Sequence, residues 1–237
     1  MGRPTRDAER LLAGGVDGLL IENYGDAPFY PESVPKHTVA AMTRVAAAVD
    51  RIADYPLGIN VLRNDAAAAI SIAAAIGADF VRINVHTGAA VTDQGMIEGR
   101  AHETLRLREQ LACDTKILAD IDVKHASPLG AERSVGDRLA DLVERGQADG
   151  VIVSGTATGE AIEADTLERA VAARADHGLS APIFVGSGVT ADFATRLLAI
   201  ADGAIVGTAL KNGGQTTNPV DVDWVERLTN AVAAHTD

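Results

Sequence analysis

The chain has 237 residues, of which 47% are hydrophobic and 23% are charged, and its formal net charge is −12. A chain of this length can bury one substantial core, so we expect a single domain over residues 1–237. The negative charge argues against nucleic-acid binding, because a phosphate backbone is held by clustered Lys and Arg side chains.

The single cysteine, Cys113, excludes an intrachain disulfide and a zinc site built from cysteines. A cytoplasmic location is therefore expected. No stretch approaches the roughly 20 apolar residues that span a bilayer, and residues 1–8 lack the apolar core of a signal peptide. Scarce Lys with abundant Asp, Glu, Ala and Arg is typical of a salt-adapted, possible halophile source or of a GC-rich one.

Short β-rich runs alternate with amphipathic stretches rich in Ala and Leu, which is the pattern of repeated βα units around a parallel sheet. The runs predict strands over residues 18–23, 57–62, 80–85, 116–123, 150–154, 182–186 and 204–208. Helices are predicted over residues 5–14, 37–53, 64–76, 97–112, 133–146, 161–176, 190–200 and 221–235.

Several strands are preceded by the same phrase, a small residue or Gln followed by Asp and a β run. It occurs as GGVDG at 14–18, GADF at 77–80, QADG at 147–150 and ADGA at 201–204. Such a turn joins a helix to the next strand at the bottom of a barrel, and its repetition favours one closed array over two domains. We therefore predict an α/β fold, a (β/α)8 TIM barrel.

A parallel barrel of this class closes with eight strands, whereas the sequence shows seven. Residues 5–14 are predicted to form a helix that leads into the first visible strand, and residues 1–6 are too short and polar to supply another one. We expect the barrel's first strand to be absent from this chain, through a misplaced start codon or a real truncation.

Side chains along a barrel strand alternate between the helix layer and the interior. The apolar parity, expected to face the helices, consists of Ile59, Val61, Val81, Ile83, Val85, Ile117, Ile121, Val151 and Val153. The polar parity consists of Asn60, Arg82, Asn84, Lys116, Asp120, Asp122 and Ser154, with Glu22 assigned by analogy. Buried charges cost several kcal/mol unless they are paired, so this set predicts a working site. For Arg82 and Lys116 a structural ion network, such as Arg82 with Glu22 or Asp120, is the alternative.

Two glycine-rich turns follow the last two predicted strands, VGSGV at 185–189 and VGTALK at 206–211. Glycine lets the backbone approach an anion closely, and the N–H groups of such a turn stabilise a phosphate. The two turns predict a phosphate site formed by Gly186, Ser187, Gly188, Gly207, Thr208 and Lys211. Plain tight turns are the alternative.

Six separated segments resemble the BtpA/SgcQ family: GLLIENYGDAPF (18–29), GINVLRND (58–65), VTDQGMIEGRAH (91–102), KILADIDVKHA (116–126), VSGTATG (153–159) and GSGV (186–189). The resemblance implies a barrel of the ribulose-phosphate-binding type. The family is named after a photosystem I biogenesis factor and a sugar-operon protein. Its members begin with a strand carrying an H-x-x-P-L-P-G-type segment that has no counterpart here, in agreement with the strand count.

The leading functional hypothesis is an enzyme that isomerises or epimerises a small phosphorylated, sugar-like metabolite by proton transfer. Asp120 and Asp122 are the predicted base and acid, and Glu22, Lys124 and His125 are further catalytic candidates. Candidates for binding the substrate are Asn23, Asn60, Arg63, Asn64, Arg82, Asn84, Thr87 and Ser154. Asp65 is expected to cap a helix.

Other interpretations stay open. Lys124 could form a Schiff base, which would make the protein an aldolase, or it could pair with Asp122. The hypothesis requires no cofactor, and a divalent metal held by Glu22, Asp120, Asp122 and His125 is an alternative. Residues 85–100 are interpreted as a lid that contacts the ligand through His86, Thr87, Asp93 and Gln94. The second functional class is a non-catalytic assembly factor that binds a protein partner, and a homo-oligomer is expected.

Overall fold

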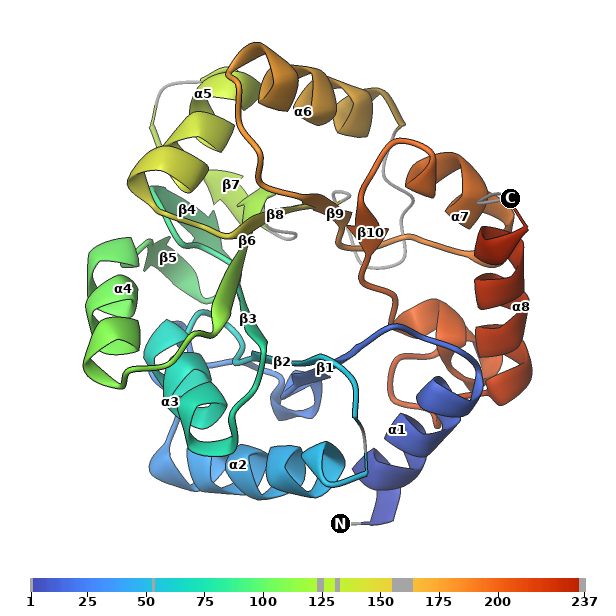
Figure 1. Cartoon of the computed structure of the whole chain (residues 1–237). Coiled ribbons are helices and arrows are strands. Elements are labelled where there is room, and N and C mark those ends of the chain that lie inside the picture. Colours follow the sequence, from blue (N-terminus) through green and yellow to red (C-terminus); the bar gives the residue numbers. More distant parts are fainter. Residues whose placement is uncertain (1, 53, 123–125, 131–132, 155–163, 235–237) are drawn as a thin grey trace.

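A computed structural model describes residues 2–52, 54–122, 126–130, 133–154 and 164–234. Seven parallel strands lie in chain order in one curled sheet: β1 (Leu19–Glu22), β2 (Leu57–Asn60), β3 (Phe80–Ile83), β6 (Lys116–Asp122), β8 (Gly150–Val153), β9 (Ile183–Val185) and β10 (Gly203–Ala204). The strands curl around a centre and the helices form an outer ring (Figure 1). The α/β fold with its seven predicted parallel strands is therefore confirmed. β1 and β10 are the two end strands of this sheet order.

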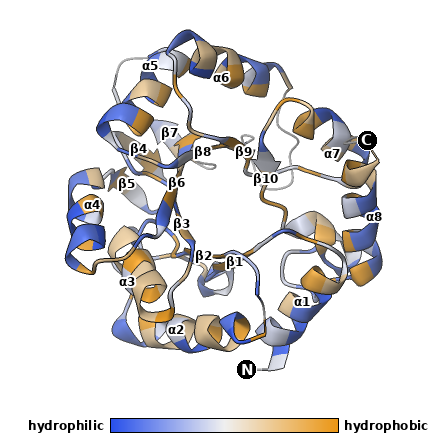
Figure 2. Ribbon diagram, in the orientation of Figure 1, coloured by the Kyte–Doolittle hydropathy of each residue, from blue (hydrophilic) through white to orange (hydrophobic). Residues whose placement is uncertain are grey.

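The outer ring consists of α1 (Gly2–Ala13), α2 (Lys36–Asp50), α3 (Ala66–Ile76), α4 (Ala101–Gln110), α5 (Val135–Ala140), a π-helical continuation (Asp141–Arg145), α6 (Ala164–Asp176), α7 (Ala191–Leu198) and α8 (Val222–Ala233). Hydrophilic residues cover the outward faces of these helices (Figure 2). The expected cap of α3 is confirmed, because the Asp65 side chain accepts a hydrogen bond from the Ala68 amide at 2.9 Å.

The repeated Asp-containing phrase lies at the bottom of the sheet, as predicted. Its Asp carboxylate accepts a hydrogen bond from the amide that opens the preceding strand. The pairs are Asp79 with Leu57 at 2.8 Å, Asp149 with Ile117 at 2.9 Å and Asp202 with Ile183 at 2.8 Å. Each bond ties the start of one strand to the turn that begins the next, so this phrase recurs for a structural reason.

The main core lies between the sheet and the helices. Ile59, Val81, Ile117 and Val151 are fully buried there in one cluster, which confirms the predicted apolar parity of these strands. Val85 departs from the prediction: it packs in a separate small cluster with Ala90 and Ile97 rather than under the outer helices.

The small cluster belongs to a second sheet, so residues 89–98 form a hairpin instead of a loop, while the interpretation of residues 85–100 as a lid stays a prediction. β4 (Ala89–Thr92) and β5 (Gly95–Glu98) form a hairpin, and β7 (Ala126–Pro128) pairs with the other edge of β4. The three strands are antiparallel in the order β5-β4-β7. The prediction of a helix from residue 97 is also wrong at its start, because residues 97 and 98 belong to β5.

Two strand ends differ from the predicted pattern. The predicted strand 204–208 is shorter, since Thr208 already begins a 3-10 turn, Thr208–Leu210. Along β6, Asp120 pairs with Ile152 and Asp122 with Val153, so two steps of β6 match one step of β8. Such a bulge disrupts the strict alternation of side chains. The side chain of Asp122 lies outside what the structure describes, so the prediction that Asp120 and Asp122 share one face stays a prediction.

Lys116 also departs from its predicted position. It was predicted among the interior polar residues, but it opens β6 at the bottom of the sheet, where its side chain is 64% exposed. Its ammonium lies 3.5 Å from Asp149. An exposed pair of this kind is structural at most.

Candidate functional site

A buried ion pair joins β3 to β6 at the centre of the curled sheet. Arg82 Nε donates to Asp120 Oδ2 at 2.9 Å, and Arg82 Nη2 donates to Asp120 Oδ1 at 2.8 Å. The Asp120 side chain is fully enclosed and that of Arg82 is 9% exposed. Burial by itself would lower the pKa of Arg82, but attraction and hydrogen bonds from Asp120, together with Glu22, raise that pKa above its ordinary value. The guanidinium therefore stays charged inside the protein.

Asp120 has two further donors. Asn84 Nδ2 donates to Oδ2 and Ser154 Oγ donates to Oδ1, each at 3.2 Å. Each carboxylate oxygen therefore accepts two hydrogen bonds, from residues that belong to or follow two strands, β3 and β8. This saturated arrangement fixes the position of the guanidinium.

Glu22 ends β1, and its register with β2 and β3 places it at the level of Asn60 and Arg82. Its Oε1 lies 3.7 Å from Arg82 Nη1, and its side chain is 30% exposed. It also lines a cavity of about 810 Å³. Glu22 is thus the carboxylate of the central cluster that faces open space.

Asn60 lies between these groups and is 1% exposed. Its Nδ2 donates to the Arg82 carbonyl at 2.9 Å and to Asn84 Oδ1 at 3.1 Å. Within the described part of the chain its Oδ1 has no hydrogen-bond partner. Asn60 at the end of β2 and Asn84 just after β3 therefore brace the Arg82–Asp120 pair.

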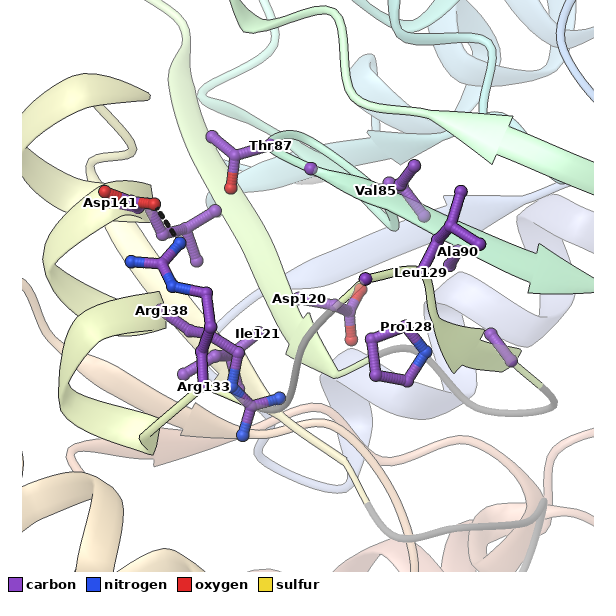
Figure 3. Close-up of a pocket in the computed structure, with 15 residues that line it drawn as sticks. Val85, Thr87, Ala90, Asp120, Ile121, Pro128, Leu129, Arg133, Arg138 and Asp141 are labelled. Carbon is purple, nitrogen blue, oxygen red and sulfur yellow. Dashed lines mark hydrogen bonds and ion pairs between the residues drawn. The ribbon is translucent and has the colours of Figure 1, made fainter.

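A second cavity, of about 560 Å³, lies beside the three-stranded sheet. Figure 3 shows Asp120 on one side of it and the Arg133–Asp141 ion pair on the other. Thr87, one of the predicted substrate contacts, also lines this cavity. The Asp120 side of the cluster is thus close to this space, whereas Glu22 lines the larger cavity.

Two of the predicted substrate-binding amides are used by the protein itself. Asn23 Oδ1 accepts from the Leu62 amide at 2.7 Å. Asn64 Oδ1 accepts from the Val85 amide at 2.8 Å, and its Nδ2 donates to the Val85 carbonyl at 2.9 Å. These side chains hold neighbouring strand ends together and contribute to the shape of the site.

Arg63 is buried close to the cluster. Burial lowers its pKa, while the negative charges of Asp93 and Asp120 oppose the shift. Asp93 lies in the turn between β4 and β5 and accepts a hydrogen bond from Gln94 at 2.5 Å. The hairpin thus places Asp93, one of the predicted ligand contacts, within electrostatic range of Arg63.

The two predicted phosphate turns differ in their surroundings. A Cβ added at Gly186 would lie 2.3 Å from Ser154 Oγ, so this glycine allows β9 to approach the central cluster. Gly188 has a φ of +71°, in the left-handed region that favours glycine. Gly207 borders open space, and Ser187 is buried.

Two side chains of the second turn, those of Thr208 and Lys211, contact residues outside the central cluster. Thr208 Oγ1 lies 2.9 Å from Thr216 Oγ1, and Lys211 Nζ lies 3.6 Å from Asp7 on α1. Burial lowers the pKa of Lys211, and Asp7 opposes that shift. Lys211 is therefore paired with α1 rather than with an acidic group of the central cluster.

Three catalytic candidates lie beyond what the structure describes. Lys124 and His125 fall outside the described residues, and so does the side chain of Asp122. Among the described residues no group of three or more His, Cys, Asp or Glu side chains is placed to hold a metal ion. The alternatives of a Schiff base and of a metal site therefore stay predictions.

His86, another predicted contact of the lid, is 1% exposed. Its Nε2 lies 2.7 Å from the carbonyl oxygen of Gly146, which can only accept a hydrogen bond. Burial lowers the pKa of His86, and the charge of Arg108 lowers it further, against the hydrogen bond to Gly146. His86 is therefore a buried neutral imidazole that joins the second sheet to the helix layer.

The family model described as the BtpA family matches residues 2–234. This chain belongs to the BtpA family. It is 44% identical over 231 residues to the Photosystem I biogenesis protein BtpA of Synechocystis sp., a match that covers 98% of this chain and 79% of that protein. It is 46% identical over 223 residues to an uncharacterized protein of Thermococcus kodakarensis, covering 94% and 82% of the two chains.

Solved structures show which fold this BtpA-family chain adopts. Thiamine phosphate pyrophosphorylase from Pyrococcus furiosus matches with a TM-score of 0.64 at 14% identity, over 98% of this chain and 91% of that one. Tryptophan synthase from M. tuberculosis matches with a TM-score of 0.60 at 20% identity, over 96% and 86%. At such identities the likeness concerns the fold alone, and it confirms a TIM-barrel-like arrangement.

Sequence reasoning missed Arg133, Arg138 and Asp141 as lining of the 560 Å³ cavity of the BtpA-family chain. Their segment has the composition of an ordinary amphipathic helix, and no local pattern distinguishes its inward charges.

No helix within the described ranges is long and apolar enough to cross a bilayer.

Proposed function

We propose that this BtpA-family chain binds a small phosphorylated, sugar-like metabolite at the carboxyl ends of its strands and isomerises or epimerises it by proton transfer. The observation that carries the proposal is the buried cluster of Arg82, Asp120, Asn84 and Ser154 beside Glu22. Replacing a buried ion pair by apolar residues is often neutral or stabilising, so stability alone is a weak reason for this cluster. Barrels of this architecture carry their chemistry at that end of the sheet.

The phosphate is assigned to the turns around Gly188 and Gly207. Gly207 has backbone exposed to open space, and the left-handed Gly188 shapes the turn before α7. The names of two structural neighbours, thiamine phosphate pyrophosphorylase and phosphoribosyl anthranilate isomerase, indicate phosphorylated ligands for those proteins. This support is an analogy of fold.

A second candidate function is that of an assembly factor, as the name of the Synechocystis relative suggests for that protein. The observation that favours it is an apolar patch of Val91, Met96 and Leu129, which are 47%, 53% and 57% exposed. Val91 and Met96 pair directly across β4 and β5, and Leu129 joins the same sheet through Ala89. Contiguous exposed apolar side chains are typical of surfaces that bind a protein partner or a second copy.

The experiment that separates the two is thermal unfolding in the presence of inorganic phosphate, of three- to six-carbon sugar phosphates and of the same sugars without phosphate. A ligand that binds only the folded state raises the melting temperature saturably, so we expect a rise with the phosphorylated compounds alone. Gly207→Val, at a position where an added Cβ meets nothing within 4 Å, should abolish the rise while keeping the ligand-free melting temperature. No saturable rise with any phosphate, together with loss of a partner or of self-association in Val91→Asp, would favour the assembly factor.

A further inference from the structure

The carboxylates of Glu22 and Asp120 both lie beside Arg82, and their surroundings differ. We infer that Glu22 is the group that transfers the proton, that Arg82 polarises the substrate oxygen, and that Asp120 is a positioning residue. The substrate class is then a phosphorylated α-hydroxy aldehyde or ketone. This inference rests on the proposed function and says which of its residues act on the substrate.

Asp120 is unsuited to be the base. Its two oxygens accept four hydrogen bonds, from Arg82 twice, from Asn84 and from Ser154. Protonating it would remove the counter-charge of a guanidinium that is itself buried, and breaking one member of a buried pair is strongly unfavourable. Although Asp120 borders the 560 Å³ cavity, its side chain has no exposed surface.

Glu22 has the opposite surroundings. It is partly exposed, it lines the 810 Å³ cavity, and its Oε1 lies 3.7 Å from Arg82 Nη1. That separation is too long for a hydrogen bond, so neither group is saturated by the other. A ligand that binds against Glu22 from the cavity would therefore lie close to the Arg82 guanidinium, whose side chain is 9% exposed.

The orientation of Arg82 supports this division. Nε and Nη2 are engaged by Asp120, which leaves Nη1 on the side of Glu22. Asn60 further fixes the strand, because it donates to the backbone carbonyl of Arg82. A guanidinium held in this way acts as a preorganised donor for an oxygen on which negative charge develops.

The chemistry balances without an oxidant or a reductant. Glu22 removes the proton from the carbon beside the carbonyl, the electrons of that C–H bond form a carbon–carbon double bond, and the carbonyl electron pair moves to the oxygen held by Arg82. Glu22 then returns the proton to the former carbonyl carbon, while the hydroxyl proton passes between the two oxygens. The result interconverts an aldose and a ketose. A single partly exposed carboxylate beside a fixed cation suits this reaction.

The test measures incorporation of deuterium from D2O into aldose and ketose phosphates of three to six carbons, together with the binding of each compound. Glu22→Gln should slow the exchange by about 10²-fold or more while the affinity for the phosphates stays the same. Glu22→Asp should retain part of the exchange, since it keeps the carboxylate. Glu103→Gln, which changes an exposed carboxylate on α4, is the matched control and should have no effect.

Asp120→Asn should slow the exchange by about tenfold and leave the shape of its pH profile unchanged, because Asp120 acts through Arg82 and does not itself transfer the proton. If this variant does not fold, Ser154→Ala replaces it, since it removes one donor from Asp120 and leaves Arg82 in place. Retained exchange in Glu22→Gln, or loss of the acidic limb of the profile in Asp120→Asn, would overturn the inference while the proposed function stands. If no compound binds, the proposed function fails and the inference with it.

Discussion

Arg82 lies side-on to Asp120 inside the curled sheet, with Nε–Oδ2 and Nη2–Oδ1 distances of 2.9 and 2.8 Å. The pair joins neighbouring strands β3 and β6, so it is part of the scaffold as well as of the candidate site. Removing one member of the pair leaves the charge of the other buried without a partner. The stability of the chain should therefore depend on Asp120 more than on any exposed carboxylate.

Asp120→Ala is expected to lower the free energy of unfolding by about 3–5 kcal/mol, because it leaves the guanidinium of Arg82 buried without its partner. Urea denaturation measures this change. Lys116→Ala removes an exposed ion pair at the bottom of the same strand and should cost less than about 1 kcal/mol. Equal losses in the two variants would contradict the assignment of a buried pair.

Gly186→Ala is expected to destabilise the protein by about 1–3 kcal/mol, as overpacked side chains do. The new Cβ would lie 2.3 Å from Ser154 Oγ and 2.5 Å from Ile152 Cγ2. Gly207→Ala is the matched control, since a Cβ there meets nothing within 4 Å. Chemical denaturation of both variants checks the prediction, which fails if Gly186→Ala is as stable as the control.

Stability should fall in mild acid through His86. Its folded pKa is lowered by burial from an ordinary value of 6.5, so the unfolded chain binds the proton first as the pH falls. The contribution is complete above about pH 6.5 and is lost between that pH and the lower folded pKa. Denaturation at several pH values should show a weaker pH dependence in His86→Gln than in the unmutated chain. An identical dependence in both would show that His86 is not the group responsible.

Asn64→Ala should lower the free energy of unfolding by about 1–3 kcal/mol, because it leaves the amide and the carbonyl of Val85 without their partner. The affinity for inorganic phosphate should stay the same. Calorimetry on the variant measures both quantities. A large loss of affinity in a variant of unchanged stability would instead show that the amide contacts the ligand.

The sequence by itself determined the order of the main strands and helices, because apolar periodicity is a local property and each βα unit carries its own pattern. It also identified the inward polar positions Asn60, Arg82, Asn84 and Asp120, since alternation holds wherever a strand is regular. The repeated Asp turn was recognisable for the same reason: its hydrogen bond reaches only to the adjacent strand, so each repeat encodes it alone.

Only the tertiary structure decided what surrounds those positions. β7 pairs with β4 across about 35 residues of chain, a contact that no local period reveals. Asp120 was predicted as a base from its parity, yet donors from β3 and from the residues after β3 and β8 saturate it. Glu22 remains partly open because it ends the strand that borders the larger cavity. Whether a carboxylate is enclosed or partly open depends on burial and on neighbours from other strands, and those exist only once the sheet has curled.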